Sequence, residues 1–129
     1  MGDNPLSVLI AVRDDELSAD LKSMLATGDI SRVHETRDAA RVFDLVRDNQ
    51  IDLVLVADTP PELNGVALIR DIRTAKDSPS PDVLMFLLVE TPSVNRLNEA
   101  VRAGVNEILL LPFGPDRLMR RISTYLVPS

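Results

Sequence analysis

Cysteine and tryptophan are absent from this sequence, and a single histidine occurs among its 129 residues. Without cysteine the chain cannot form a disulfide framework, a thiolate zinc site or a cysteine nucleophile. The one histidine, His34, has no second histidine with which to hold a transition metal. We interpret His34 as a surface or edge-strand residue, and any metal bound here would need oxygen ligands.

Long hydrophobic runs are also absent. No apolar segment approaches the roughly 20 residues that a helix needs to span a bilayer. The apolar stretch at residues 6–12 is short, and charged residues follow it in place of the cleavage site of a signal peptide. We therefore expect a cytoplasmic protein that does not bind membranes.

Positive charge is the third scarce feature. The chain has 14 lysine and arginine residues against 20 aspartate and glutamate residues, which gives a net charge of -6 at pH 7. Binding to nucleic acid or to anionic lipid depends on a surplus of lysine and arginine. The sequence therefore predicts no nucleic-acid partner.

Hydrophobic residues make up 45% of the chain, which is too large a share for a disordered protein. The length is close to the commonest domain size of roughly 100–150 residues. We expect a single domain over residues 1–129.

Apolar runs recur along the chain at the spacing of a repeated strand and helix unit. They fall at residues 6–12, 51–57, 83–89 and 105–111, with a weaker run around Val33. Continuous apolar runs of this length are typical of strands buried on both faces, as in a parallel sheet covered by helices.

The segments between these runs carry apolar residues at helical spacing, and we expect each stripe to face the sheet. Gly104 is placed to end the fourth helix, and Pro115 after Gly114 is placed to open the fifth. The five stripes are Leu17, Leu21 and Leu25; Ala39, Val42 and Val46; Leu68, Ile69 and Ile72; Val94, Leu97 and Val101; and Leu118, Ile122 and Leu126.

Five strand and helix units with right-handed crossovers predict a doubly wound α/β fold. In such sheets, ligands bind beyond the carboxyl ends of the strands. The first strand-to-helix turn, residues 12–16, has no glycine and carries three acidic side chains. These features oppose a pyrophosphate, and neither common nucleotide-binding glycine motif occurs. We therefore expect no nucleotide or other small ligand.

Several short segments occur in the order and spacing of the receiver domains of bacterial response regulators, the CheY-like proteins. They are residues 8–12 followed by acids, 52–56 before a turn, 61–65, 103–107 and 111–113. The chain resembles this family over nearly its whole length. The resemblance implies a (βα)5 flavodoxin-like sheet with strand order 2-1-3-4-5 and a role in two-component signalling or a phosphorelay.

In that family an aspartate at the end of the third strand accepts a phosphoryl group, and acids after the first strand hold Mg²⁺. A threonine or serine on the fourth strand and a lysine before the proline on the fifth bind the phosphoryl oxygens. Oxygen ligands suit Mg²⁺, and a transferring phosphoryl group needs positive charge and hydrogen-bond donors. The resemblance therefore makes each of these positions a candidate site residue.

The acceptor position lies eight residues before Gly65 and is occupied by Ala57. A methyl group cannot be phosphorylated. The two metal-binding positions after the first strand fall on Arg13 and Asp14, so a cation replaces one carboxylate.

The two donor positions are also altered. The hydroxyl position lies fifteen residues before Gly104 and is Val89. The lysine position, directly before Pro112, is Leu111. The aromatic residue that reports phosphorylation in many relatives corresponds to Ile108.

These departures predict a degenerate receiver, or pseudo-receiver. We expect an atypical signalling domain that is not phosphorylated, is not an enzyme, needs no cofactor and acts through protein–protein contact. The degenerate pocket consists of Arg13, Asp14, Ala57, Asp58, Val89 and Leu111.

A rival alignment shifts the site by one residue. It makes Asp58 the acceptor and leaves Asp14 and Asp15 to hold Mg²⁺, which would make the chain an active receiver. This alignment needs an extra residue at two strand-to-loop junctions, and a slip of one residue in a strand reverses the face of every side chain. No shift restores the lysine, because residues 109–111 are all leucine.

Arg13 offers a physical account of the altered pocket. Its guanidinium would fill the region of the metal and pair with Asp14 and Asp58, since arginine readily makes bidentate contacts with carboxylates. The simpler alternative is an Arg13 that extends into solvent. Residues 14–16 have a simpler interpretation too, as the acidic start of a helix.

One loop and one peptide bond are also predicted. Residues 74–82 are rich in serine, proline and aspartate, which predicts a surface loop. The Leu111–Pro112 bond occupies a place where the family commonly has a cis peptide.

The usual partner or dimer surface of the family is formed by the fourth helix, the fifth strand and the fifth helix. Arginine and tyrosine around an apolar strand suit an interface, although a solvated helix face has a similar composition. We expect a signalling partner with an acidic patch, such as a histidine kinase or an output protein, or a homodimer. The residues expected on this face are Arg96, Glu99, Arg102, Ile108, Leu110, Arg117, Arg120, Arg121 and Tyr125.

Overall fold

Residues 4–126 are described by the structure, a computed structural model. Strand and helix alternate along the whole of this range. The strands are β1 (Asn4–Ala11), β2 (Ile30–Thr36), β3 (Leu53–Ala57), β4 (Leu84–Val89) and β5 (Glu107–Leu110). The helices are α1 (Asp15–Ala26), α2 (Val42–Asn49), which follows a short 3₁₀ turn at Ala39–Arg41, α3 (Gly65–Thr74), α4 (Val94–Ala103) and α5 (Pro115–Tyr125).

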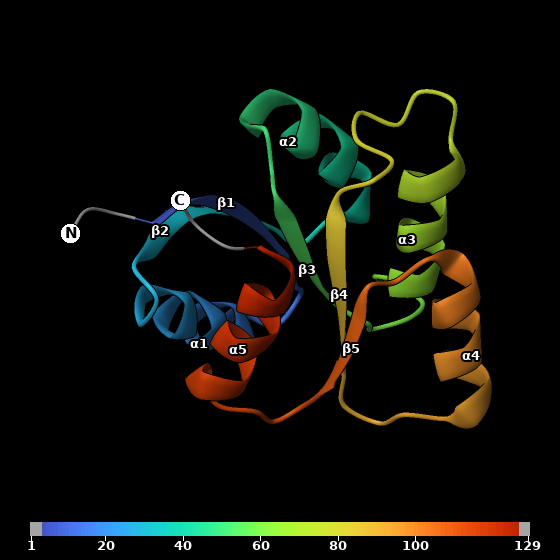
Figure 1. Ribbon diagram of the computed structural model, residues 1–129. Coiled ribbons are helices and arrows are strands. Elements are labelled where there is room, and N and C mark those ends of the chain that lie inside the picture. Colours follow the sequence, from blue (N-terminus) through green and yellow to red (C-terminus); the bar gives the residue numbers. More distant parts are fainter. Residues whose placement is uncertain (1–3, 127–129) are drawn as a thin grey trace.

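The five strands form one parallel sheet in the order β2-β1-β3-β4-β5, with helices on both faces (Figure 1). Helices α1 and α5 cover one face, and α2, α3 and α4 cover the other. The predicted fold class and strand order are therefore confirmed. In the described part of the chain, no helix has both the length and the apolar character needed to cross a bilayer.

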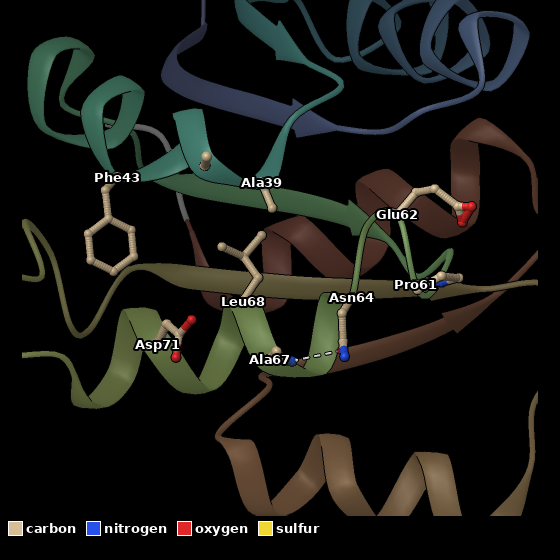
Figure 2. A pocket seen from close by; sticks show the side chains of 9 residues that line it. Ala39, Phe43, Pro61, Glu62, Asn64, Ala67, Leu68 and Asp71 are labelled. Atoms are coloured by element: carbon tan, nitrogen blue, oxygen red, sulfur yellow. Dashed lines mark hydrogen bonds between the residues drawn. The ribbon is translucent and has the colours of Figure 1, made fainter.

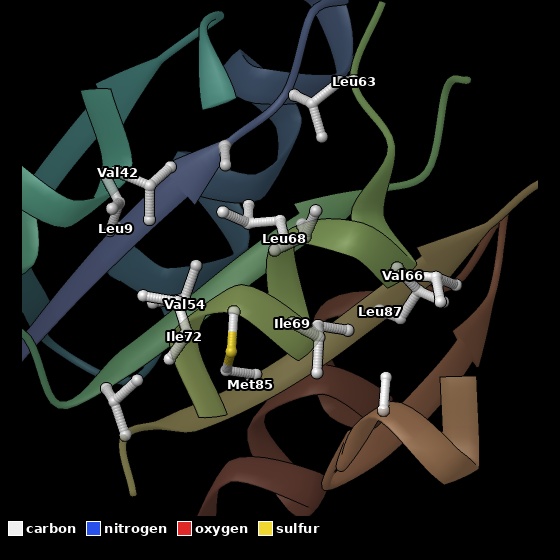
Figure 3. Close-up of a cluster of buried hydrophobic side chains, with 14 of the residues drawn as sticks. Leu9, Val42, Val54, Leu63, Val66, Leu68, Ile69, Ile72, Met85 and Leu87 are labelled. Carbon is white, nitrogen blue, oxygen red and sulfur yellow. The ribbon is translucent and has the colours of Figure 1, made fainter. Parts of the chain in front are cut away.

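The central strands form the buried middle of the molecule. Every residue of β3 and β4 is buried, which explains the continuous apolar runs. Side chains of β3 point alternately to the two faces, so Val54 and Val56 face α3 while Leu55 faces α1 and α5. Figure 3 shows how the apolar stripe of α3 packs over Val54 and Met85.

The predicted helix boundaries are confirmed at the last two helices. Gly104 ends α4 with a φ of 103°, a left-handed conformation that glycine adopts without the steric cost of a Cβ atom. Gly114 precedes α5, and Pro115 occupies its first turn. The Leu111–Pro112 peptide is cis, as the resemblance implies.

The stripe predicted for the fourth helix is wrong. Val94 and Val101 are 73% and 64% exposed, and the residues that α4 buries are Ala100 and Ala103. The reason is that α4 lies close beside α3, where small side chains fit and large ones do not. The spacing of large apolar residues therefore pointed to the outer face of this helix.

Arg73, near the end of α3, joins the amino edges of the last two strands. Its Nε donates to the Gly104 carbonyl at 2.9 Å, and its Nη1 donates to the Pro81 and Val83 carbonyls at 2.8 and 2.6 Å. Its Nη2 donates to Asn106 Oδ1 at 2.7 Å. We call this arrangement the Arg73 clamp; all of its acceptors are neutral.

Candidate functional site

The carboxyl edge of the sheet is where a doubly wound fold binds its ligands. Ala57 and Val89 are the last residues of β3 and β4, and each is 3% exposed. Leu111 follows β5, and its backbone N–H donates to the Val89 carbonyl at 2.9 Å. None of these three side chains offers a polar atom to a phosphoryl group or a metal ion.

Asp58 is the first residue after β3 and turns toward α3 and α4. Its Oδ1 accepts a hydrogen bond of 2.8 Å from the backbone N–H of Gly65. Both of its oxygens are bound by Arg96, with Nε to Oδ2 and Nη2 to Oδ1 each at 2.8 Å. The same Nη2 donates to Asn64 Oδ1 at 2.7 Å. We call these four residues the Arg96 clamp.

Local structure positions each part of this clamp. Asn64 is the N-cap of α3, where its Oδ1 also accepts the backbone N–H of Ala67, and Gly65 is the first residue of that helix. Arg96 lies in the first turn of α4, which is capped by Ser93. Glycine fits position 65 closely, because an added Cβ would lie 2.5 Å from Leu87 Cδ1 and 3.2 Å from Asp58 Oδ1 and would force the Leu87 side chain to shift.

The two charges of the clamp are largely removed from water. The side chain of Asp58 is 5% exposed and that of Arg96 is 21% exposed. The hydrogen bond to Asp58 is the main cause that raises the pKa of Arg96 above its ordinary value, and burial acts in the opposite direction. Such a pair is stable only while both partners are present.

The acids that follow β1 have other partners. Asp14 is the N-cap of α1, and its Oδ1 accepts the backbone N–H groups of Glu16 at 2.9 Å and Leu17 at 3.3 Å. Asp15 pairs with Arg37 at 2.6 Å. Asp14, Asp15 and Asp58 are thus engaged in three separate contacts. Within residues 4–126, no group of three or more histidine, aspartate or glutamate residues is arranged to hold a metal ion.

Arg13 does not form the pairing with Asp14 and Asp58 that was one of its two possible roles. The carboxylate of Asp58 is held by Arg96 instead. Arg13 is half-exposed and forms no ion pair with any residue in the described range. The physical reason is the alternation of side chains at the strand end: Ala57 lies in the core on the α1 and α5 face, and Asp58 points the other way.

A hollow of about 310 Å³ remains beside α1 at this edge. Four of its seven lining residues are acidic and three are apolar, and no lysine or arginine lines it. Asp14 already serves as a helix cap here, so the hollow does not reproduce a magnesium site. The lining residues are Asp14, Glu16, Leu17, Asp20, Glu90, Leu111 and Pro112.

The face formed by α4, β5 and α5 shows an uneven distribution of the predicted interface residues. Arg96 is turned into the clamp, and Ile108 is half-buried, so neither lies open on this face. Arg117, Arg120 and Arg121 line one hollow of about 160 Å³ on α5. The predicted residues that are exposed are Glu99, Arg102, Leu110, Arg117, Arg120 and Tyr125.

A small polar network orders the middle of this face. Arg121 Nη2 lies 2.7 Å from Glu107 Oε1, and the Tyr125 hydroxyl lies 2.9 Å from the same oxygen. Burial is the main cause that raises the pKa of Tyr125, and the hydrogen bond that Arg121 donates to Glu107 is the main cause that raises the pKa of Arg121. The Tyr125 ring also packs edge-on against Phe86, with 5.8 Å between the ring centres.

The role of Arg96 is the feature that sequence reasoning missed. Asp58 and Arg96 are 38 residues apart and follow different strands, so no local spacing connects them. Arg96 was assigned to the outer face of this helix, because Val94, Leu97 and Val101 were expected to face the sheet. The one available signal was that Val94 and Val101 compete with Ala100 and Ala103 for the inner face, and a reversed assignment would have turned Arg96 inward.

A five-stranded parallel sheet in the order β2-β1-β3-β4-β5, with helices on both faces, defines a CheY-like α/β domain. Solved structures agree. CheY4 of Vibrio cholerae has a TM-score of 0.81 at 16% identity and covers 94% of this chain and 98% of its own. A putative response regulator from Chloroflexus aurantiacus has a TM-score of 0.81 at 20% identity, with 93% and 96% covered.

Sequence comparison identifies the family. Residues 8–123 match the response regulator receiver domain, and the chain belongs to this family of two-component signalling proteins. It is 25% identical over 122 residues to the response regulator MprA of Mycobacterium sp. (strain KMS) and 21% identical over 118 residues to the transcriptional regulatory protein SrrA of Staphylococcus aureus (strain NCTC 8325 / PS 47). These alignments cover 95% and 92% of this chain but 51% and 47% of the relatives, so the chain spans about half their length.

Proposed function

We propose that this receiver domain signals without phosphoryl transfer, as a cytoplasmic protein–protein interaction module rather than an enzyme. The observation that carries the proposal is the Arg96 clamp. The spacing from Gly65 assigns the family's acceptor position to Ala57, the last residue of β3, and the neighbouring carboxylate of Asp58 is bound on both oxygens by Arg96. No cofactor is part of the proposed function.

The clamp opposes the use of Asp58 as a substitute acceptor. A carboxylate that attacks phosphorus needs a free oxygen lone pair that faces the phosphoryl donor. Here Oδ1 accepts from Gly65 and Arg96, Oδ2 accepts from Arg96, and the side chain is 5% exposed. Releasing one oxygen would separate a buried ion pair, and losing one partner of such a pair costs about 3–5 kcal/mol.

The same contacts suggest how the domain works. Through Asn64 and Gly65 the clamp ties the loop after β3 to the first turn of α4. This ion pair holds α4 in place with no phosphoryl group. The face of α4, β5 and α5 would then be presented to partners continuously.

The chemistry of that face indicates the kind of partner. Arg117, Arg120 and Arg121 on α5 lie together, which favours an acidic segment on a signalling partner such as a histidine kinase or an output protein. A homodimer through the same face is the second candidate, because Val94 and Val101 present large apolar side chains to water.

Incubation with acetyl phosphate and Mg²⁺, followed by intact mass measurement, tests the absence of phosphorylation. We expect an unchanged mass, with a phosphorylatable receiver in the same tube as the positive control. A phosphoryl adduct on this chain that is lost in Asp58→Asn would establish the rival function, an active receiver with Asp58 as acceptor and Mg²⁺ held by Asp14 and Asp15.

A further inference from the structure

A groove lies between α2 and α3, on a side of the molecule that neither the strand-end pocket nor the α4, β5 and α5 face includes. Its volume is about 350 Å³. Figure 2 shows it between the 3₁₀ turn before α2, the helix α2 itself and the first two turns of α3. The lining residues are Ala39, Ala40, Phe43, Pro61, Glu62, Asn64, Ala67, Leu68 and Asp71.

The walls of the groove are mostly apolar. Phe43 lies on the α2 side of the groove and Leu68 on the α3 side (Figure 2). Ala39 and Ala67 lie nearer to the loop that carries Pro61 and Glu62. Phe43 packs against the apolar core cluster but is only half-buried. An aromatic ring that stays partly in water beside a groove is the kind of surface on which a partner's apolar side chain gains burial.

Two carboxylates stand at opposite ends of the groove. Glu62 lies at the loop end and Asp71 at the far end, near Phe43 (Figure 2). Both are exposed, and neither forms an ion pair with any residue between 4 and 126. No lysine or arginine lines the groove. By contrast, Asp44 on the outer side of α2 is paired with Arg47.

We propose that this groove binds a partner segment that carries a bulky apolar side chain flanked by lysine or arginine. The apolar side chain would lie between Phe43 and Leu68, and the cationic groups would meet Glu62 and Asp71. Charge complementarity selects this occupant, because an acidic or neutral segment would leave both carboxylates unpaired beside it.

The groove also touches the Arg96 clamp. Asn64 lines its loop end, caps α3 and accepts the hydrogen bond from Arg96. A bound segment would therefore contact the same loop that holds α4. The proposal does not depend on the absence of phosphorylation, because the groove is formed by residues outside the strand-end pocket.

Selection from a phage-displayed library of random 12-residue peptides on the full chain tests this proposal. We expect enriched sequences with a large apolar residue and neighbouring lysine or arginine. One enriched peptide, labelled with fluorescein, then gives affinities by fluorescence anisotropy, and ¹⁵N chemical shifts locate its site. The shifts are expected at Ala39, Phe43, Ala67 and Leu68.

Charge reversal provides the matched comparison. Glu62→Lys with Asp71→Lys should weaken binding about tenfold, since two charge contacts become repulsive. Asp77→Lys with Asp116→Lys makes the same change in net charge at exposed positions elsewhere and should leave the affinity within about twofold. Phe43→Ala should weaken binding about thirtyfold if the ring is the central contact.

Several results would overturn the proposal. They are the absence of enrichment over a protein-free selection, an acidic consensus, which would point to the arginines of α5, and equal affinity for the two charge-reversed proteins. If sedimentation of the unliganded chain showed a dimer that Phe43→Ala dissociates, a second copy would be the occupant and the proposed partner would be wrong.

Discussion

Two arginines hold the two edges of this sheet, and their partners differ in kind. At the amino edge, Arg73 donates to three backbone carbonyls and to the side-chain oxygen of Asn106, all neutral. At the carboxyl edge, Arg96 donates to the carboxylate of Asp58. Both clamps join a helix to neighbouring loops, but only the second one neutralises an acid.

The pKa of each guanidinium depends on the group that it contacts. Burial lowers the pKa of Arg73 below its ordinary value, whereas the hydrogen bond to Asp58 raises the pKa of Arg96. The comparison teaches that an arginine with neutral acceptors serves the fold alone. Arg96, by contrast, occupies both oxygens of the Asp58 carboxylate, and in our proposal it therefore also keeps that acid from acting as a phosphoryl acceptor.

The largest effect is expected from Arg96→Ala. It leaves the buried carboxylate of Asp58 without its cation, and the free energy of unfolding should fall by about 3 kcal/mol. Urea unfolding measures this loss. Arg102→Ala, at an exposed position of the same helix, is the control and should stay within about 0.5 kcal/mol.

Removing both charges sharpens this result. The pair of substitutions Asp58→Leu and Arg96→Leu should recover most of the stability lost in Arg96→Ala, since an apolar pair needs no compensation. A double variant less stable than Arg96→Ala would show that the hydrogen bonds of Asn64 and Gly65, rather than the charge pair, hold this edge.

Arg73→Ala should have the second largest effect, a loss of about 2 kcal/mol. Its carbonyl acceptors are partly buried and would lose their donor, which costs less than an unpaired charge. Arg70→Ala, on the exposed side of the same helix, is the matched control. A loss larger than that of Arg96→Ala would break the distinction between charged and neutral partners.

The smallest effect is expected at an exposed ion pair. Hydrogen bonds from Lys22 and Ser18 lower the pKa of Glu35 below its ordinary value of 4.5. A lowered pKa in the folded state means that the stabilisation is complete above pH 4.5 and is lost as the pH falls through the folded-state value.

Glu35→Gln should therefore be slightly less stable than the natural chain at pH 7, by a few tenths of a kcal/mol. The difference should shrink as the pH falls below 4.5. Thermal unfolding at a series of pH values measures it. A difference that grows toward acid would reverse the sign of the linkage.

Most of the fold could be predicted from the sequence, because it depends on patterns that are local. Continuous apolar runs marked the buried strands, and Gly104 and Pro115 marked helix ends through their backbone preferences. Helix α4 was the exception, since the choice of its inner face depends on how closely α3 approaches it. A hydrophobic pattern shows which residues are apolar, but it does not show how much space the neighbouring helix leaves for their side chains.

The candidate site was predictable only in part, for the same physical reason. Spacing from Gly65 and Gly104 assigned the acceptor and hydroxyl positions to Ala57 and Val89, and both residues are the last of their strands, at the carboxyl edge of the sheet. The partner of Asp58 was not predictable, since α3 and β4 lie between Asp58 and Arg96 in the sequence and three-dimensional packing alone brings them together. The groove between α2 and α3 was missed as well, because its two walls come from separate helices.

The central claim is that Arg96 engages Asp58 permanently, in place of phosphoryl chemistry. The ¹H–¹⁵N signal of Arg96 Nε reports this bond directly. We expect a sharp signal, protected from exchange with water, that disappears in Asp58→Asn and does not move when Mg²⁺ and beryllium fluoride, a phosphoryl mimic, are added. A signal that broadens or shifts on that addition, together with shifts at Asp14 and Asp15, would contradict this claim. It would indicate that the chain is an active receiver that can be phosphorylated.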